Sequence, residues 1–330
     1  MVKTVEGTFE LDDGASLYTK SWFPEENESK LRARMVMIHG FNDHVDRYYG
    51  LFPYLAARGI AVHGLDQRGW GRSVRTSADR GRTGPTARVL ADMAAFIRSV
   101  LSLSSPVPVP VFVLGHSMGG GQVLTLASTP SYSSLVRQLR GLILESPFLG
   151  FAPELQPSRL TIVSGRLASH LLPHFQLHRP IPPEDVTRDV AVQQSIRDDP
   201  LMHEHGTLEG LAGMLDRTDA LASGKLALER GVVRSLFMAH GDADKVTSFE
   251  RSREWFDREC GSGGGSVAVQ GERKVPDATF KNYKGFAHQL HADPGKEEFY
   301  EDVANWILQR CDDDNSASAG KGEGKVQPHL

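Results

Sequence analysis

Cysteine is almost absent from this chain: only Cys260 and Cys311 occur among its 330 residues. They form neither a C-x-x-C pair nor a metal-ligand spacing, which excludes a disulfide scaffold and argues against a zinc site. No apolar run approaches the roughly 18 residues of a membrane-spanning helix. The first ten residues carry charge early and lack the apolar segment of a signal peptide. We therefore expect a protein of a reducing compartment, the cytoplasm, while attachment to a membrane surface stays open.

An excess of positive charge is missing as well. The net charge is −4 and the sequence pI is about 6.4, so no basic field favours nucleic acid as a partner. The apolar share of 40% and the charged share of 24% are ordinary for a soluble globular protein. The length allows one large α/β domain with an insertion, or two small domains.

Short apolar runs alternate with helical stretches along most of the chain, which is typical of a doubly wound sheet. Two alternating segments around Asp12-Asp13-Gly14 predict an opening hairpin. Apolar residues from Val89 to Leu101 recur at the spacing of an amphipathic helix. Helices are also predicted up to residue 58, directly after residue 117 and over 297–309. Strands are predicted over 7–11, 16–23, 35–38, 60–65, 111–114, 141–144, 232–239 and 279–283.

This alternation stops between about residues 150 and 228, where prolines, histidines and helical pieces occur without a strand-like run. We expect a mostly helical cap inserted over the sheet. The chain then divides into a first part of the core (1–149), the cap (150–228), a second part of the core (229–311) and a polar tail (312–330). The tail is expected to be disordered, and the Gly/Ser-rich stretch 261–265 to form a flexible surface loop.

Gly115-His116-Ser117-Met118-Gly119 is the only G-x-S-x-G in the chain. It directly follows an apolar strand and opens a helix, which is the setting of a nucleophile elbow. The sharp turn strains the serine backbone and leaves no room for side chains at the flanking glycines. The helix N-terminus stabilises developing negative charge. The pattern therefore predicts Ser117 as a nucleophile; the alternative is a structural serine in a Gly-rich helix cap.

A serine nucleophile needs a base, and the base needs an orienting carboxylate. In proteins with such an elbow the chain order is serine, then acid, then histidine, with the last two after late strands. Asp244 and His288 each follow a late predicted strand, so both fit this order. Asp242 competes with Asp244, and His291 competes with His288. Asp244 is favoured because an acid several residues past a strand end can reach over to the histidine.

A tetrahedral intermediate also needs two N–H donors. One is Met118, the residue after the nucleophile, and the other is expected from Phe41 in the loop after the third strand. His39 in that loop is expected to shape the loop rather than to take part in catalysis. We interpret the charged side chains of residues 66–73 as structural, holding the chain in place rather than taking part in the chemistry.

Five histidines in the predicted cap raise the question of a metal. Pro173 separates His170 from His174, and no H-x-x-x-H helix with a partnering carboxylate emerges. We therefore expect no metal, and we expect all five to lie on the surface. They are His170, His174, His178, His203 and His205.

Taken together, these segments resemble the monoglyceride lipase and lysophospholipase group of the α/β-hydrolases, from about Gly7 to Arg310. The most specific mark is GHSMGG combined with a cap placed after the strand that ends in Ser146-Pro147. The matching segments are HGFNDH (39–44), DQRGWGRS (66–73), GHSMGG (115–120), GLILESP (141–147), Asp199-Pro200-Leu201, HGDADKV (240–246) and YKGFAH (283–288).

The resemblance implies an α/β-hydrolase fold, with a mostly parallel sheet flanked by helices and a mostly helical cap. It implies a Ser117, Asp244 and His288 triad with Phe41 and Met118 as oxyanion donors. The reaction would convert a lipid ester, most simply a monoacylglycerol, to fatty acid and glycerol through an acyl-enzyme, without metal or organic cofactor. The family's cap carries an apolar helix that forms the mouth of an acyl-chain tunnel and touches lipid surfaces such as membranes or droplets. Its counterpart here, which could instead pack against the core, would present Leu160, Val163, Leu167 and Leu171.

Other functions stay open on the same core: small-ester esterase, lysophospholipase, acyltransferase or aminopeptidase. An aminopeptidase needs acidic residues in the cap to bind a free amine, and Glu184, Asp185 and Asp189 are candidates. A serine at the elbow argues against dehalogenases and epoxide hydrolases, whose nucleophile is a carboxylate. A ligand-binding protein of weak activity is a different class, but every catalytic position holds a competent residue, which favours an enzyme. Acyl-chain preference and oligomeric state are not predicted.

Overall fold

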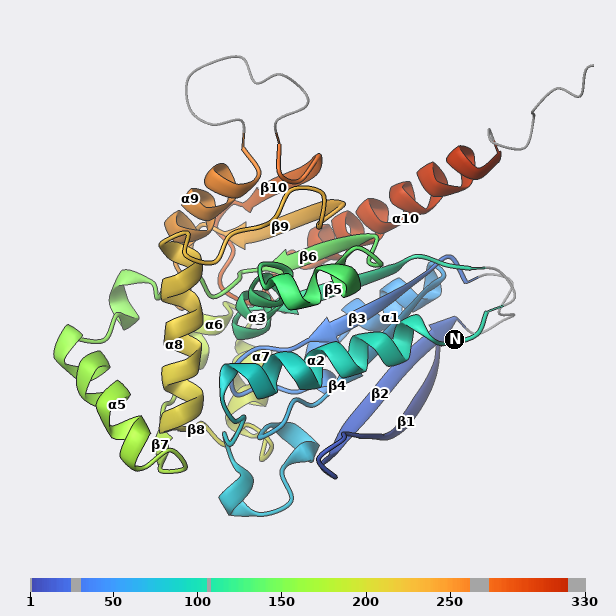
Figure 1. Ribbon diagram of the computed structural model, residues 1–330. Coiled ribbons are helices and arrows are strands. Elements are labelled where there is room, and N and C mark those ends of the chain that lie inside the picture. Colours follow the sequence, from blue (N-terminus) through green and yellow to red (C-terminus); the bar gives the residue numbers. More distant parts are fainter. Residues whose placement is uncertain (1, 25–30, 106–107, 262–272, 320–330) are drawn as a thin grey trace, which may run out of the picture.

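The computed structural model describes residues 2–24, 31–105, 108–261 and 273–319, with side chains as far as Cys311. Its centre is an eight-stranded sheet in the order β1-β2-β4-β3-β5-β6-β9-β10, with helices on both faces (Figure 1). The pairs β1–β2 and β2–β4 are antiparallel and all other pairs are parallel. Each of the eight predicted strands overlaps one of these. The strands are β1 (Val2–Glu10), β2 (Ser16–Pro24), β3 (Ala33–Ile38), β4 (Ile60–Leu65), β5 (Val111–His116), β6 (Gly141–Glu145), β9 (Ser235–Gly241) and β10 (Asp277–Tyr283).

Two apolar layers, one on each face of the sheet, hold the helices of the core in place. Every residue of β3, β4, β5, β6 and β9 is buried, as expected for parallel strands covered on both faces. The helices of the core are α1 (Leu51–Ala57), α2 (Thr86–Leu101), α3 (Met118–Ala127), α4 (Ser133–Val136), α9 (Phe249–Glu259) and α10 (Glu297–Ala319). Short 3-10 helices lie at Val45–Tyr48, Gly71–Ser73, Ser77–Asp79, Pro130–Tyr132 and Pro153–Leu155.

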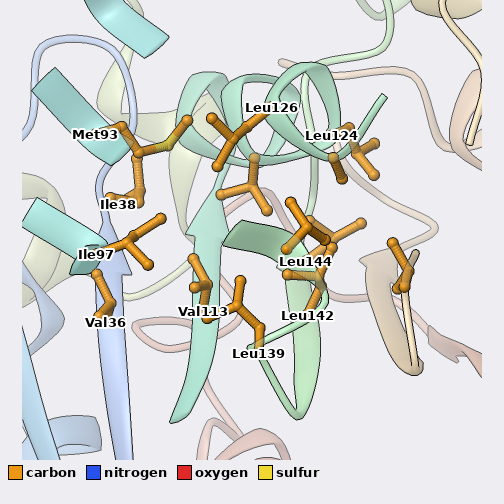
Figure 2. Close-up of a cluster of buried hydrophobic side chains, with 14 of the residues drawn as sticks. Val36, Ile38, Met93, Ile97, Val113, Leu124, Leu126, Leu139, Leu142 and Leu144 are labelled. Atoms are coloured by element: carbon orange, nitrogen blue, oxygen red, sulfur yellow. The ribbon is translucent and has the colours of Figure 1, made fainter. Parts of the chain in front are cut away.

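The predicted amphipathic helix is α2, and its apolar stripe faces the sheet. Met93 and Ile97 of this helix lie against Val36 and Ile38 of β3 (Figure 2). Full burial of one such side chain stabilises the fold by about 1.5–3 kcal/mol. This layer also covers β5 and α3, so the strand and the helix that flank Ser117 are both fixed by the core.

The segment 150–228, predicted as a cap, lies between β6 and β9 and is mostly helical. Helix α8 contacts α3 of the core, and α5 lies beside α8 at the edge of the molecule (Figure 1). The segment also contains an antiparallel two-stranded sheet, β7–β8, where we had predicted no strand. Strands of three residues are too short to show a period of two in the sequence. The elements are α5 (Arg159–Leu171), β7 (Gln176–His178), α6 (Pro183–Val186), α7 (Val190–Arg197), β8 (His205–Thr207) and α8 (Leu208–Ala222).

Side chains that follow β3 and β4 tie this segment to the core. Asp199 Oδ2 lies 2.9 Å from His44 Nε2 and 3.3 Å from Arg47 Nη1. His203 stacks on Trp70 with ring centroids 5.1 Å apart, and burial lowers its pKa to about 4.

The prediction that all five cap histidines lie on the surface is therefore wrong for two of them. His203 and His205 are half-buried, because the tie to the core draws their part of the cap inward. The histidines at 170, 174 and 178 are exposed, as predicted.

The last helix is longer than predicted. Helix α10 continues to Ala319, so residues 312–319 are helical where we had expected disorder. Val303 and Ile307 are fully buried and anchor the helix. Each further residue then adds a backbone hydrogen bond without a new nucleation cost, and apolar periodicity is not needed. Two stretches lie outside the described residues: 320–330 of the predicted tail and 262–265 of the predicted flexible loop.

Candidate active site

Ser117 occupies the tight turn between β5 and α3. Its backbone has φ 53° and ψ −118°, a region that residues other than glycine rarely adopt. Three backbone hydrogen bonds hold this turn. The Ser117 N–H donates to the carbonyl of Glu145 (2.9 Å), and its own carbonyl accepts from Gly121 (3.1 Å) and Phe148 (2.8 Å). The strained conformation predicted for a nucleophile elbow is therefore present and is held by its neighbours.

The flanking glycines are required by close backbone contacts. A Cβ atom on Gly115 would lie 2.7 Å from the carbonyl oxygen of Gly119. A Cβ atom on Gly119 would lie 2.1 Å from the carbonyl oxygen of Ile38 and 2.6 Å from that of His39. Because the obstructing atoms belong to the backbone, no side-chain rotation relieves these clashes. The structure thus shows the lack of room predicted from the motif.

Asp244 and His288 meet directly after the last two strands of the sheet. His288 Nδ1 lies 2.8 Å from Asp244 Oδ2, and the Asp244 side chain is fully buried. The same oxygen accepts from His240 Nε2 (3.0 Å) and Thr247 Oγ1 (2.7 Å), while Oδ1 accepts from the N–H groups of Val246 and Thr247. Burial alone would raise the pKa of Asp244, but His288 and His240 outweigh it and hold this pKa well below its usual range.

The competing residues have other partners. Asp242 is exposed and accepts from the Gly285 N–H (2.6 Å) and from Asn282 Nδ2 (3.1 Å), so it closes a turn. His291 bonds to Glu145 and not to Asp244. The structure therefore brings together the favoured pair, Asp244 and His288.

The His288 ring also lies next to the nucleophile turn. Its centroid is 4.9 Å from that of His116, the residue that precedes Ser117. His288 is buried, and so is Ser117. The three residues of the predicted triad thus come from three separate loops at one edge of the sheet.

The loop after β3 passes close over Ser117. A Cβ atom on Gly40 would lie 3.2 Å from the Cβ of Ser117. His39 fixes this loop, because its Nδ1 donates to the Gly40 carbonyl (2.8 Å) and its Nε2 accepts from the Gln67 N–H (2.8 Å). Burial lowers the pKa of His39, which favours this neutral form. These contacts give His39 the loop-shaping role predicted for it.

Phe41 and Met118, the predicted oxyanion donors, line the same cavity as Ser117. Met118 is the first residue of α3, and the first N–H groups of a helix have no acceptor within it. Residues 66–73 support the loop as predicted, since Asp66 accepts from the N–H groups of Val45 (2.9 Å) and Arg72 (2.8 Å).

A cavity of about 260 Å³ opens above Ser117, between the core and the segment 150–228. Its lining is mostly apolar and includes Phe148 of the core, Phe151 at the start of the segment 150–228, and several leucines of α8. The charged residues that the structure places in the lining are Arg166 and Arg179, with no Asp or Glu among them. Arg166 is paired with Asp216 and Asp219 on α8.

The four apolar residues predicted on the cap helix do not line this cavity. They lie on the outer face of α5, where Leu160, Val163, Leu167 and Leu171 are 78%, 53%, 66% and 82% exposed. The helical spacing identified the stripe correctly but could not show which way it faces. The opposite face of α5 contributes to the cavity, through Thr161, Ile162, Gly165 and Arg166.

Among the described residues, one group has the side chains and spacing for a metal ion. His116, Glu145 and His291 are buried, and their ligand-type atoms lie within 4.8 Å of one another. Sequence analysis missed this group because its members come from β5, β6 and the loop after β10. The one signal was Glu145 itself, a charged residue that ends an apolar strand. In the part of the chain that the structure describes, no helix could span a bilayer.

Comparison with known proteins fits this geometry. The Hydrolase_4 family model, described as serine aminopeptidase S33, matches residues 29–295. The chain belongs to this family of α/β-hydrolases. A Schizosaccharomyces pombe protein assigned as a monoglyceride lipase is 32% identical over 298 residues, covering 89% of this chain and 72% of the relative. Mouse monoglyceride lipase is 28% identical over 318 residues, covering 94% and 91% of the two chains.

The solved structures show the same fold. A soluble variant of monoglyceride lipase from Saccharomyces cerevisiae, solved in complex with a substrate analog, superposes with a TM-score of 0.79 at 20% identity. The match covers 92% of this chain and 94% of the yeast chain. The predicted α/β-hydrolase fold is confirmed, and so is the prediction of a carboxylic ester hydrolase similar to monoglyceride lipases.

Proposed function

We propose that this α/β-hydrolase cleaves the ester of a long-chain lipid, most simply a monoacylglycerol, with Ser117 as nucleophile. The observation that carries the proposal is the buried Asp244–His288 pair beside the Ser117 turn, under an apolar cavity. A fixed carboxylate orients the histidine so that Nε2 can take the serine proton. An apolar cavity can hold an acyl chain.

The reaction would follow from these positions. Ser117 Oγ attacks the ester carbonyl while His288 Nε2 takes its proton, and Asp244 stabilises the imidazolium. The N–H groups of Phe41 and Met118 bind the oxyanion. His288 then protonates the leaving alcohol, here glycerol. In the second half a water molecule, activated by His288, releases the fatty acid from Ser117.

The aminopeptidase alternative has less support from the cap, despite the name of the family model. A free amine needs a nearby carboxylate, but the described cavity lining contains none. Glu184 is paired with Arg197. Asp189 caps α7 by accepting from the Ala191 N–H (3.0 Å). These acidic side chains are thus occupied outside the cavity.

The segment 150–228 would act as the cap over this cavity and as the contact to lipid. We infer that the outer face of α5, with Leu160, Val163, Leu167 and Leu171, rests transiently on a membrane or droplet surface. These side chains are exposed together on one helix, where water contact is unfavourable. Location in the cytoplasm stays a prediction.

A substrate panel tests the proposed function. Fatty acid release would be measured with a long-chain monoacylglycerol, a triacylglycerol and a lysophospholipid, together with a short p-nitrophenyl ester and an aminoacyl amide. We expect the highest kcat/KM for the monoacylglycerol and no release by Ser117→Ala. Turnover confined to the aminoacyl amide or to short esters would overturn the lipid substrate and leave the nucleophile standing.

A further inference from the structure

A second buried acid–histidine pair lies beneath the proposed triad and has no part in the mechanism above. The side chains of Glu145 and His291 are both fully buried. Glu145 Oε1 accepts from the backbone N–H of His291 (3.0 Å) and lies 2.7 Å from His291 Nδ1. The loop that carries His288 is thereby bound to the end of β6.

Glu145 also contacts the nucleophile turn. Its backbone carbonyl accepts the N–H of Ser117 at 2.9 Å. One residue therefore holds the serine with its backbone and the histidine loop with its side chain. His291 follows His288 by three residues, and the residues between them form no helix or strand. A backbone bond from the Gln289 N–H to the Val186 carbonyl (2.9 Å) holds the residue after His288. Side-chain bonds add to it: Asp244 supplies one, Glu145 another, and Asp293 accepts the Ala287 N–H (3.1 Å) as a third.

The groups that face Glu145 are mostly histidines. Burial disfavours its charged form, but His291 and His116 outweigh burial and lower the pKa of Glu145, so the carboxylate is ionised at neutral pH. Its second oxygen, Oε2, has no hydrogen-bond partner in the described structure. The His116 ring lies 5.2 Å from that of His291 and 4.9 Å from that of His288.

Two further groups complete these surroundings. The Tyr48 ring stacks on His291 at 4.4 Å, and its hydroxyl donates to Asp43 Oδ2 at 2.9 Å. The same hydroxyl lies 3.1 Å from His116 Nδ1. Asp43 is thus the second buried acid near His116, but it approaches from the loop after β3 and does not contact the loop of His288.

We propose that Glu145 is a positioning residue that sets His288 against Ser117. This inference rests on the proposed role of Ser117 and His288. The tie can be tested with two variants, because Glu145→Gln keeps a side-chain oxygen that accepts from His291, whereas Glu145→Ala removes it.

The test compares these variants with a matched control. Glu259→Gln changes another buried glutamate, which lies on α9 and bonds to Lys274 and to the N–H of Leu228, away from the site. For each protein, kcat and KM would be measured with a soluble ester. The labelling rate of Ser117 by a fluorophosphonate would serve as a readout that does not depend on the lipid substrate.

We expect kcat of Glu145→Ala to fall about 10- to 100-fold with KM little changed, the scale of a misplaced catalytic group. Glu145→Gln should recover most of this loss, because its side-chain oxygen still accepts from His291. Glu259→Gln should leave kcat and KM unchanged. Should Glu145→Ala fail to fold, His291→Phe tests the tie: it keeps a ring against Tyr48 but its side chain has no donor for Glu145, so it should slow labelling of Ser117.

Wild-type kcat and labelling rate in Glu145→Ala, or an equal loss in Glu259→Gln, would overturn the inference. A loss in Glu145→Gln as large as in Glu145→Ala would overturn it as well. Failure of the proposed function is distinct, because the wild type would then label Ser117 without releasing fatty acid, or would not label at all.

Discussion

Replacement of Asp244 by asparagine tests how the acid acts on His288. Both carboxylate oxygens of Asp244 only accept: Oδ1 from two backbone N–H groups, and Oδ2 from His288, His240 and Thr247. The side-chain amide of an asparagine at this position must turn its NH2 group either toward the two backbone N–H groups or toward the three side chains. Backbone N–H groups cannot become acceptors, whereas a histidine can change its tautomer. The NH2 group will therefore face His288 Nδ1 and force the proton onto Nε2, the atom that should take the proton of Ser117.

The wrong tautomer is expected to lower kcat about 10⁴-fold, the scale known for the same change in a serine protease triad. That factor corresponds to about 5.4 kcal/mol at about 1.36 kcal/mol for each tenfold change. KM should change little, because Asp244 does not line the cavity. The assay is steady-state hydrolysis of a long-chain p-nitrophenyl ester, with circular dichroism to verify folding.

Asp242→Asn is the matched control, since Asp242 is exposed and its side chain bonds to the Gly285 N–H and to Asn282, away from His288. It should keep kcat within about threefold, as for a surface change away from the site. An Asp244→Asn enzyme with more than a tenth of wild-type kcat would refute the reasoning, and so would equal losses in the two variants.

Three further predictions concern the elbow, the outer face of α5 and acid stability. Gly119→Ala should lower the free energy of unfolding by at least about 3 kcal/mol, because the new Cβ meets backbone oxygens. Gly165→Ala has open space around it, so it should be neutral or stabilising by up to about 1 kcal/mol. Urea unfolding measures both variants, and equal effects would contradict the close packing at Gly119. The double variant Leu167→Ser with Leu171→Ser should sediment less with phosphatidylcholine vesicles, while the free energy of unfolding changes by less than about 1 kcal/mol. Val5 is an exposed apolar residue on β1, and Val5→Ser should leave vesicle sedimentation unchanged. The pKa of Asp43 lies well below its usual 3.8, because His116 and other histidines outweigh burial. The contribution of Asp43 to stability is therefore complete above about pH 4, and it is lost as the pH falls toward the pKa that Asp43 has in the folded protein. Asp43→Asn should therefore flatten the loss of stability between about pH 5 and pH 3, and an unchanged slope would show that Asp43 is not ionised in the fold.

The parts of the molecule that sequence reasoning predicted well have local causes. Parallel strands covered on both faces are continuous apolar runs, so β3 to β6 could be recognised one at a time. The elbow combines a strand, a tight turn and a helix within a few residues around Ser117. The order of serine, acid and histidine then placed Asp244 and His288, and their 2.8 Å contact agrees with it.

The parts that escaped prediction depend on distant segments. The Glu145–His291 pair joins residues that are 146 positions apart, and no local pattern relates them. Both faces of α5 carry apolar residues, so the position of α8 decides which face points outward. His203 is drawn inward by Trp70, which precedes it by more than a hundred positions.

Detection of an acyl-enzyme tests the central claim most directly. The wild type would be mixed with a long-chain p-nitrophenyl ester, quenched in acid during the first turnover, digested and analysed by mass spectrometry. We predict that the peptide containing Ser117 gains the mass of the acyl group, and that this signal is absent from Ser117→Ala. Ester turnover that continues in Ser117→Ala, or an acyl group found on another residue, would contradict the account.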